Sequence, residues 1–350
     1  RTLVVALMMM GAATTLIGLL PTYAAIGVAA PLILVLLRFV QGLAIGGQWG
    51  GAMLLVTESA PADQRGWYGA YAQAGAPVGV ILANLAFIGV SSSMSEEAFM
   101  DWGWRLPFIA SIVLIGISMY VQLRLEDTEA FKALQESQDG EASDQPIAAS
   151  PVVEAIRKYP KRIMLAAGAF LSVQVTFYIL IAFIIAYGVT APELALSRDT
   201  MLTAVLIAAA IMVPSQFYFS GLSDRVGRKQ IYRWGAILTG LWGFALFPLI
   251  NTGEPLMIVI AVTLGLTFLG MQYGPQAAYF TELFTTEVRY SGASLGYQIG
   301  AILGGALAPT IAVLLWNELG IFYVSVYILV AAILTLLSLS ALEETKGRTL

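Results

Sequence analysis

The chain has 350 residues, of which 58% are hydrophobic and only 11% are charged. Soluble domains carry about 25% charged residues, so this composition excludes a soluble globular protein and indicates a membrane protein. The chain contains no cysteine and no histidine, which excludes disulfides, thiolate chemistry, histidine acid–base catalysis and the usual zinc sites.

Ten apolar runs are long enough to cross a bilayer, which takes about 20 residues of helix. Strands of a membrane barrel would alternate and be about half as long, so the sequence predicts an all-α polytopic membrane protein. The first run follows Arg1 directly, without a signal-peptide cleavage pattern. The predicted spans are 3–20, 31–57, 68–90, 106–123, 163–188, 201–222, 231–250, 256–281, 291–315 and 320–342.

The distribution of basic residues predicts the orientation of the spans. Of the 18 lysines and arginines, Arg105 and Arg198 fall in loops on one side, Arg38 lies inside a span, and the others fall on the opposite side. The side rich in lysine and arginine is cytoplasmic by the positive-inside rule. Loops 58–66, 124–162, 223–230 and 282–290 and the C-terminus are therefore predicted to be cytoplasmic, in the plasma membrane (the inner membrane of a bacterium).

An internal repeat links the two halves of the chain. GQWGGAMLLVTESAPADQRG (47–66) aligns with MQYGPQAAYFTELFTTEVRYSG (271–292), which pairs Gln48 with Gln272, Glu58 with Glu282, and Arg65 with Arg289. The matched pieces are the second and eighth spans, so the repeating unit holds six helices and both copies have the same orientation. We expect two six-helix bundles with pseudo-twofold symmetry, of which ten of twelve helices are present and two would precede Arg1.

The repeat also predicts how the chain is divided. The polar stretch between the two copies contains the acidic run LQESQDGEASDQP and is expected to be a surface linker. The predicted parts are four helices of the N-terminal bundle (1–123), a cytoplasmic linker (124–162), the C-terminal six-helix bundle (163–342) and a cytoplasmic tail (343–350).

Two motifs resemble those of the major facilitator superfamily. Its loop motif, roughly GxxSDRxGRR, appears within GLSDRVGRKQ (221–230), and its RxxQGxxxG motif appears as Arg38, Gln41, Gly42 and Gly46. The strings GGQWGGAMLLVTE (46–58), WGWRLPF (102–108) and 271–301 resemble the metabolite:proton symporter family within it. Gln48 and Glu343 depart from that family, which usually has glutamate and proline there. The closing ETKGRTL (344–350) is shared with sugar porters.

A candidate gate is expected at the cytoplasmic ends of the helices. Asp224 ends a helix, where an acid is stabilised by facing the positive N-terminus of another helix. The resemblance implies that its motif latches a cytoplasmic gate against the start of the ninth span, near Tyr290 to Gly292. The recurring glutamates and arginines are expected to pair with the arginines of the motif, although independent helix-end salt bridges are the alternative. The predicted gating residues are Asp224, Arg225, Arg228, Lys229, Glu58, Arg65, Glu282 and Arg289.

A candidate substrate site follows from polar side chains inside the spans. Arg38 is a charge at bilayer depth, which is costly unless it faces a cavity or a partner. A cation among glutamine and tyrosine donors suits a carboxylate, whereas a structural arginine and interhelical glutamines remain the alternative. The predicted substrate-binding residues are Arg38, Gln41, Gln48, Gln174, Tyr178, Gln272, Gln276 and Tyr279.

These observations predict a secondary active transporter and not an enzyme. The resemblance implies alternating access and symport of a small organic carboxylate or zwitterion with protons, by a monomer in the lipid bilayer. We expect no cofactor, no metal site and no nucleic-acid partner. A sugar-porter-like carrier, an exporter, and a transporter-like sensor or accessory membrane subunit without flux are the alternatives.

Overall fold

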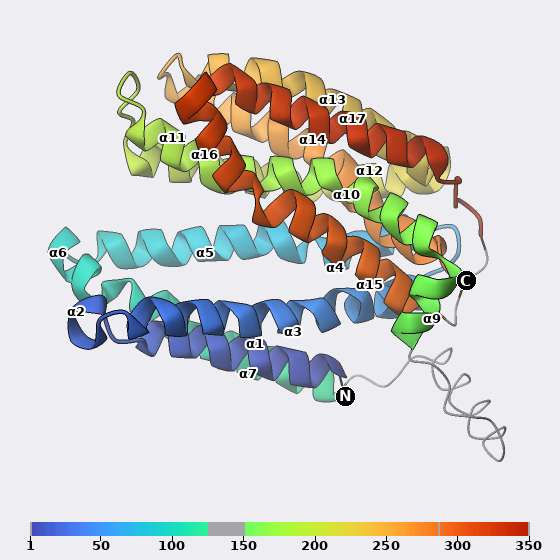
Figure 1. Ribbon diagram of the computed structural model, residues 1–350, viewed down its shortest axis with the longest axis horizontal. Helices are drawn as coiled ribbons and strands as arrows, with labels where there is room; N and C mark the ends of the chain where they lie inside the picture. The colour runs from blue at the N-terminus through green and yellow to red at the C-terminus, as the bar shows by residue number, and fades with distance from the viewer. Residues whose placement is uncertain (1, 125–150, 286–287, 349–350) are drawn as a thin grey trace. The chain divides into compact units, whose positions relative to one another are not determined.

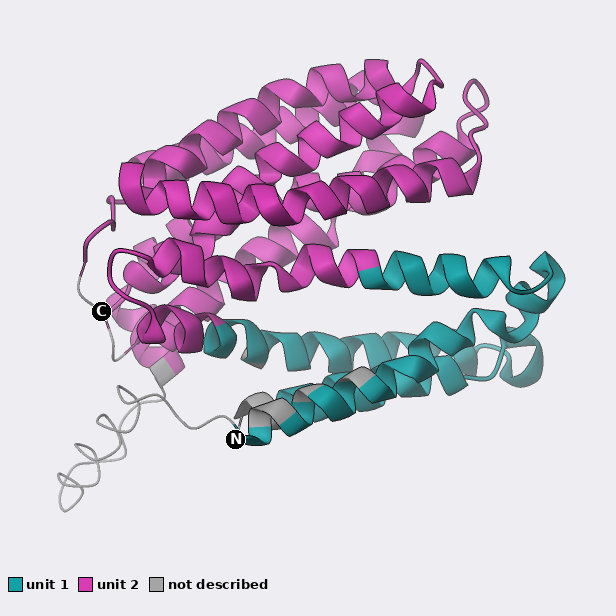
Figure 2. Cartoon of the chain, turned by 180° about the vertical axis from the view of Figure 1, so that it is seen from behind, with its two compact units in different colours: residues 1–52, 82–146 teal, residues 53–81, 147–350 magenta. Residues whose placement is uncertain are grey.

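The structure, a computed structural model, describes residues 2–124, 151–285 and 288–348, and every regular element in these ranges is helical (Figure 1). Most of the predicted linker, including its acidic run, lies outside the described residues. The described ranges fall into two units, which Figure 2 colours separately: residues 1–52 with 82–146, and residues 53–81 with 147–350.

The first helices of the chain agree closely with the predicted spans. A π-helical turn, Phe99–Gly103, leads into α7. The α-helices here are α1 (Thr2–Leu19), α2 (Tyr23–Ile26), α3 (Ala29–Ser59), α4 (Arg65–Gln73), α5 (Gly75–Ser92), α6 (Glu96–Ala98) and α7 (Arg105–Arg124).

The remaining helices follow the part of the linker that lies outside the described residues. Two of their spans contain π-helical turns, at Ile179–Phe183 between α10 and α11 and at Ala301–Ala306 between α15 and α16. The α-helices are α9 (Pro151–Lys158), α10 (Pro160–Tyr178), α11 (Ile184–Thr190), α12 (Arg198–Val226), α13 (Arg228–Ile250), α14 (Pro255–Glu282), α15 (Arg289–Gly300), α16 (Ala308–Leu319) and α17 (Ile321–Ala341).

The described helices account for eight or nine of the ten predicted membrane spans. Among the described residues, eight helices are long and apolar enough to cross a membrane, or nine if the bent pair Glu96–Gly103 and Arg105–Ile117 is one span. The other predicted span coincides with α1, whose apolar part Val5–Leu19 is shorter. The chain is therefore a polytopic helical membrane protein, as predicted.

Local sequence signals explain where several helices begin and end. Ser197 caps α12 by accepting a hydrogen bond from the Thr200 N–H at 3.1 Å. Pro160 and Pro255 each open a helix, where the missing N–H has no cost. Gly227 joins α12 to α13 in a single residue with φ of 124°, a conformation that favours glycine.

The borders of the two units differ from those of the predicted bundles. They fall at 52/53 inside α3 and at 81/82 inside α5, and the C-terminal end of α3 and the N-terminal end of α5, together with α4, belong to the unit that holds α9 to α17. The cause is the set of polar contacts that α4 and the end of α3 make with the C-terminal helices, described below. The predicted division into two six-helix bundles stays a prediction.

A row of small residues brings α15 against α10 in the second unit. A Cβ on Gly296 would lie 2.7 Å from Ala166 Cβ, and one on Gly300 would lie 2.8 Å from the Ala167 carbonyl oxygen. Larger side chains would force the two backbones apart, so glycine sets their separation.

In the first unit, the WGWR stretch ties α7 to α1. Arg105 donates from Nη1 to the Gly18 carbonyl at 3.0 Å, and its guanidinium lies 4.7 Å from the Trp104 ring centroid. The hydrogen bond satisfies a free carbonyl at the end of α1. Together with the ring contact it holds the bent entry to α7 in place.

Candidate functional site

The loop motif after α12 places a carboxylate on the first turn of α4. Asp224 accepts hydrogen bonds from the backbone N–H groups of Gly66 at 2.8 Å and Trp67 at 2.9 Å. The first turn of a helix has N–H groups without intrahelical partners and a partial positive charge, so a carboxylate is stabilised there. A Cβ on Gly66 would lie 2.6 Å from the Ser220 carbonyl oxygen, so glycine permits the close approach of α12.

The helix that receives Asp224 is not the expected one. The predicted contact with the helix start near Tyr290 to Gly292 is wrong, because the bonds go to Gly66 and Trp67. The two helix starts occupy corresponding positions in the repeat. The loop motif of the second repeat copy therefore binds the helix start of the first copy. The repeat alignment indicates this alternative, because it matches the start of α4 with the start of α15.

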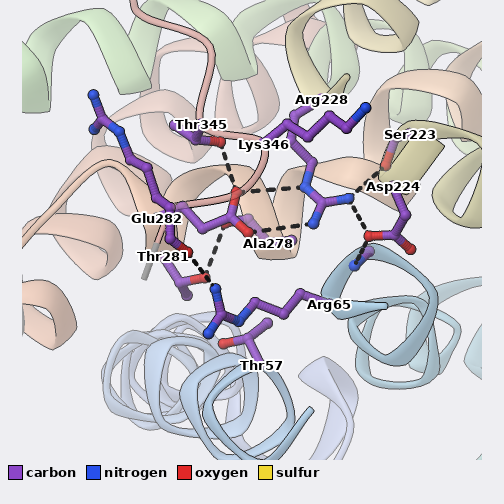
Figure 3. Close-up of polar contacts among 12 residues, drawn as sticks. Thr57, Arg65, Ser223, Asp224, Arg228, Ala278, Thr281, Glu282, Thr345 and Lys346 are labelled. Carbon is purple, nitrogen blue, oxygen red and sulfur yellow. Dashed lines mark hydrogen bonds and ion pairs between the residues drawn. The ribbon is translucent and has the colours of Figure 1, made fainter. Parts of the chain in front are cut away.

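Arg228 is the centre of the cluster (Figure 3). Its guanidinium forms an ion pair with Asp224, lies 3.3 Å from Glu282 Oε1, and donates to Ser223 Oγ at 3.1 Å. The side chains of Arg228 and Glu282 are each 1% exposed. Buried charges of this kind are stabilised only when they are paired and hydrogen-bonded, and removing one partner costs about 3–5 kcal/mol.

The C-terminal tail contributes a second carboxylate cap. Glu344 accepts hydrogen bonds from the backbone N–H groups of Arg228 at 2.9 Å and Lys229 at 3.0 Å, at the first turn of α13. Asp224 on α4 and Glu344 on α13 are thus two equivalent helix caps. Sequence reasoning used the ETKG stretch only as a family signature and missed this role.

Other tail residues join the same network. Thr345 is fully buried and donates to Glu282 Oε2 at 2.6 Å. Arg65 donates from Nη1 to the Arg348 carbonyl at 2.6 Å. We call the cluster of Asp224, Arg228, Glu282, Glu344 and Thr345, with the first turn of α4, the latch.

The other predicted gating residues lie around the latch. Glu58 at the end of α3 pairs with Arg289 at the start of α15 at 3.1 Å, which joins the two halves of the repeat a second time. Lys229 donates to the Leu342 carbonyl at 2.5 Å, just after the end of α17. Arg225 is exposed, and its carbonyl rather than its guanidinium contacts Lys346.

Two of the three predicted substrate residues on α14 contact the neighbouring helix α13. Gln272 is fully buried and donates to Thr239 Oγ1 of α13 at 2.8 Å. Tyr279 donates its hydroxyl to the Glu343 carbonyl at 2.9 Å and packs on Tyr232. Tyr279 lies one turn from the end of α14 and its hydroxyl is bound to the tail, so its place in a substrate site stays a prediction. Gln276 is fully buried as well.

The predicted residues on α10, Gln174 and Tyr178, lie beside Gly304 and Gly305 in the π-helical turn between α15 and α16. Gln174 is 8% exposed, whereas Tyr178 is 38% exposed and packs close to Gly305, whose Cβ would lie 2.8 Å from the tyrosine ring. Tyr273 of α14 is hydrogen-bonded to Tyr297 of α15. In the alignment of 47–66 with 271–292, Tyr273 falls opposite Trp49, and this match of two aromatic residues is the sequence signal that could have identified it.

The predicted residues on α3 belong to the other unit and form a short hydrogen-bonded chain. Arg38 is exposed and donates to Gln41 Oε1 at 3.4 Å, while Gln41 donates to Thr14 Oγ1 of α1 at 2.7 Å. Gln48 is half-buried. The guanidinium of Arg38 is thus exposed, whereas that of Arg228 is buried and paired with two carboxylates.

These arrangements can hold and release helix ends but do not assemble reactive groups. Within the described ranges, no three acidic side chains are grouped to hold a metal ion. The latch consists of hydrogen bonds and ion pairs, which can form and break without covalent chemistry.

Comparison with known proteins agrees with this chemistry. The family model of the Major Facilitator Superfamily matches residues 1–295. The chain belongs to the major facilitator superfamily. Like its relatives, it is a transporter of the bacterial inner membrane and not an enzyme.

Three relatives from this superfamily span most of the chain. The inner membrane metabolite transport protein YhjE of Escherichia coli is 38% identical and covers 100% of this chain and 78% of its own. The shikimate transporter of E. coli is 34% identical over 92% of this chain and 74% of its own. The glycine betaine/proline/ectoine/pipecolic acid transporter OusA of Dickeya dadantii is 30% identical over 100% of this chain and 70% of its own.

A solved structure shows the same superfamily fold. The proton:xylose symporter XylE, bound to 6-bromo-6-deoxy-D-glucose, matches with a TM-score of 0.76 over 100% of this chain and 81% of its own. The sequence identity is 16%, so the likeness concerns the fold alone.

Proposed function

We propose that this secondary transporter moves a small carboxylate-bearing or zwitterionic metabolite by alternating access, in symport with protons. The observation that carries the proposal is the latch, which ties the start of α4 in the first repeat to α12, α13 and the tail in the second. Alternating access needs polar contacts of this kind, because they close one side of the carrier in one state and break in the other.

In the proposed cycle, opening toward the cytoplasm begins when α4 leaves Asp224. The two N–H groups on Gly66 and Trp67 and the ion pair between Glu58 and Arg289 are the bonds that must break. The Arg228–Glu282 pair and the Glu344 cap lie within the C-terminal helices and can stay intact. The moving part of the latch is then the start of α4, and the fixed part is the cluster on the C-terminal helices and tail.

The substrate class follows from Arg38. Its exposed guanidinium is the natural anchor for a carboxylate, since both groups are planar and can form two parallel hydrogen bonds. The names of the shikimate transporter and of OusA support this class, because shikimate, proline and glycine betaine each carry a carboxylate. Gln41 orients the guanidinium from one side through its hydrogen bond.

Proton coupling is the finer part of the proposal. Gln48 cannot titrate, so coupling requires a carboxyl group elsewhere. The fold of a proton symporter supports coupling without locating the group.

Uptake into proteoliposomes tests substrate class and coupling together. The reconstituted protein is given radiolabelled shikimate, proline, glycine betaine or xylose, with and without an inward proton gradient. We expect gradient-dependent uptake of at least one carboxylate compound that a protonophore abolishes. Uptake of xylose alone would contradict the substrate class, and uptake that ignores both the gradient and the protonophore would contradict symport.

The Arg38 assignment needs its own variant. Arg38→Gln is expected to raise the KM for the carboxylate at least tenfold, because an ion-paired hydrogen bond contributes about 1.5–3 kcal/mol. Arg198→Gln, the same substitution at the exposed start of α12, is the matched control and should leave the KM unchanged.

A further inference from the structure

A basic segment joins α9 to α10, outside the latch. Arg157, Lys158, Lys161 and Arg162 lie close together in the sequence, and no acidic residue falls between them. Glu154 pairs with Lys158 at 2.6 Å and neutralises that charge. Arg157, Lys161 and Arg162 carry the remaining positive charges of the segment.

A cavity of about 190 Å³ lies beside the same segment. Lys161 and Arg162 supply its basic side, and Leu165, Leu283 and Leu342 supply an apolar side. A pocket with one cationic and one apolar wall fits an amphipathic molecule better than a free ion, since a free ion gains nothing from the leucines.

Arg162 is fixed at the edge of this cavity. It donates from Nη1 to the Leu283 carbonyl at 3.1 Å, and its guanidinium lies 5.5 Å from the Tyr159 ring centroid. Its side chain is still 35% exposed, so donors remain available to a ligand. Because the guanidinium is already held in place, little conformational entropy is lost on binding.

The acid in the cavity lining does not cancel this charge. Glu343 lies 3.7 Å from Arg162 but forms a closer ion pair with Arg348. Two guanidinium groups thus share one carboxylate, and Lys161 adds a further positive charge to the lining. The lining keeps a net positive charge.

The helix before this segment exposes an apolar face. Val152, Val153 and Ile156 of α9 are 42%, 54% and 50% exposed and lie on one side of the helix, while Ala155 is fully buried. The helix precedes the first residue of the α10 span, so these side chains are not part of a transmembrane segment. An apolar face flanked by lysine and arginine is typical of a helix that lies in the membrane interface.

We propose that Lys161, Arg162 and the apolar face of α9 form a binding site for an anionic phospholipid of the cytoplasmic leaflet. The phosphate lies on the two cations, and the acyl chains lie along Val153 and Ile156. Basic residues on the cytoplasmic side attract anionic headgroups, and the exposed valines and isoleucine distinguish a lipid from a soluble phosphate.

The site also adjoins the latch. Arg162 holds the carbonyl of Leu283, the residue after Glu282, and Tyr159 packs on Phe284 with ring centroids 6.2 Å apart. A lipid that orders this segment therefore orders the end of α14, which carries one carboxylate of the latch.

The test measures lipid binding to the purified protein in a neutral detergent. Native mass spectrometry counts bound lipid during titration with phosphatidylglycerol, phosphatidylcholine or inorganic phosphate. Each basic residue near an anionic surface contributes about a factor of five in affinity. We therefore expect Lys161→Gln with Arg162→Gln to weaken phosphatidylglycerol binding about 25-fold, on the same constants.

Two further variants keep the result interpretable. Arg124→Gln with Arg198→Gln removes the same charge elsewhere and should leave the affinity unchanged. Lys161→Gln alone changes an exposed side chain, so it keeps the test valid if the double variant does not fold; it should weaken binding about fivefold.

Three results would overturn the proposal. The first is equal affinity for phosphatidylglycerol and phosphatidylcholine. The second is an equal loss in the control double variant. The third is inorganic phosphate at millimolar concentration displacing the lipid completely, which would indicate a site for a soluble anion. Preferential phosphatidylglycerol binding that depends on Lys161 and Arg162 supports it.

Discussion

Asp224→Asn is expected to open the contact between α4 and α12. Asparagine keeps one acceptor oxygen, so one of the two N–H groups on Gly66 and Trp67 loses its partner, and Arg228 loses one of its two carboxylates. A hydrogen bond to a charged group contributes about 1.5–3 kcal/mol. The Asp224–Arg228 pair lies on the same side of the gate in both states, so the expected loss of about 2–3 kcal/mol in the free energy of latch closure comes from the N–H groups of α4. That change raises the open fraction about 30- to 150-fold.

Alkylation of a single introduced cysteine measures the open fraction. The chain has no cysteine, so a maleimide can react only at the introduced position. Ala70 of α4 is fully buried, and its carbonyl accepts a bond from Gln216 of α12 at 3.4 Å. In the Ala70→Cys background, the alkylation rate follows the open fraction while the latch is mostly closed, so Asp224→Asn should raise it by the same factor.

Asp199→Asn is the matched control, since Asp199 lies in the exposed first turn at the opposite end of the same helix. An unchanged rate in Asp224→Asn, or an equal rise in Asp199→Asn, would refute the reasoning that the carboxylate at position 224 holds α4 closed.

Three further substitutions test other parts of the latch and site. Gly66→Ala should raise the same alkylation rate, because its Cβ would meet the Ser220 carbonyl; an unchanged rate would mean that α4 has room to shift. Glu344→Ala should lower the free energy of unfolding by about 1 kcal/mol through loss of the α13 cap, seen in thermal unfolding in detergent. Tyr279→Phe should cost about 1 kcal/mol in the same measurement and leave the transport KM unchanged, whereas a raised KM would place Tyr279 in the substrate site.

The sequence predicted the helices well because hydrophobic length and helix-end signals are local. The span expected at 231–250, for example, is α13 at Arg228–Ile250, which begins after Gly227 as the loop motif requires. Signals of this kind need no knowledge of neighbours, so helix existence and approximate bounds follow from composition and glycine or proline placement.

The partners of the charged residues were less accessible from the sequence. The carboxylate at Asp224 was expected to cap a helix, and it does, but the choice between two similar helix starts depends on how the repeats face each other. The cap by Glu344 depends on the path of the tail after α17, which no periodicity encodes. Side-chain direction is equally hard to predict at Tyr279, since a polar stripe on α14 can face α13 and the tail as readily as a substrate.

Arg228 shows why the latch acts as a unit. Its N–H is donated to Glu344 of the tail, while its guanidinium bonds to Asp224 of α12 and Glu282 of α14. All three carboxylates bond to Arg228, so none of them can move far without disturbing the bonds of the other two. The free energies of buried polar bonds that share a charge are not additive. Such a cluster favours two discrete arrangements over gradual bending, because a half-paired buried charge is costlier than either end state. Substrate binding at a distant site can offset a modest free-energy difference between those two arrangements.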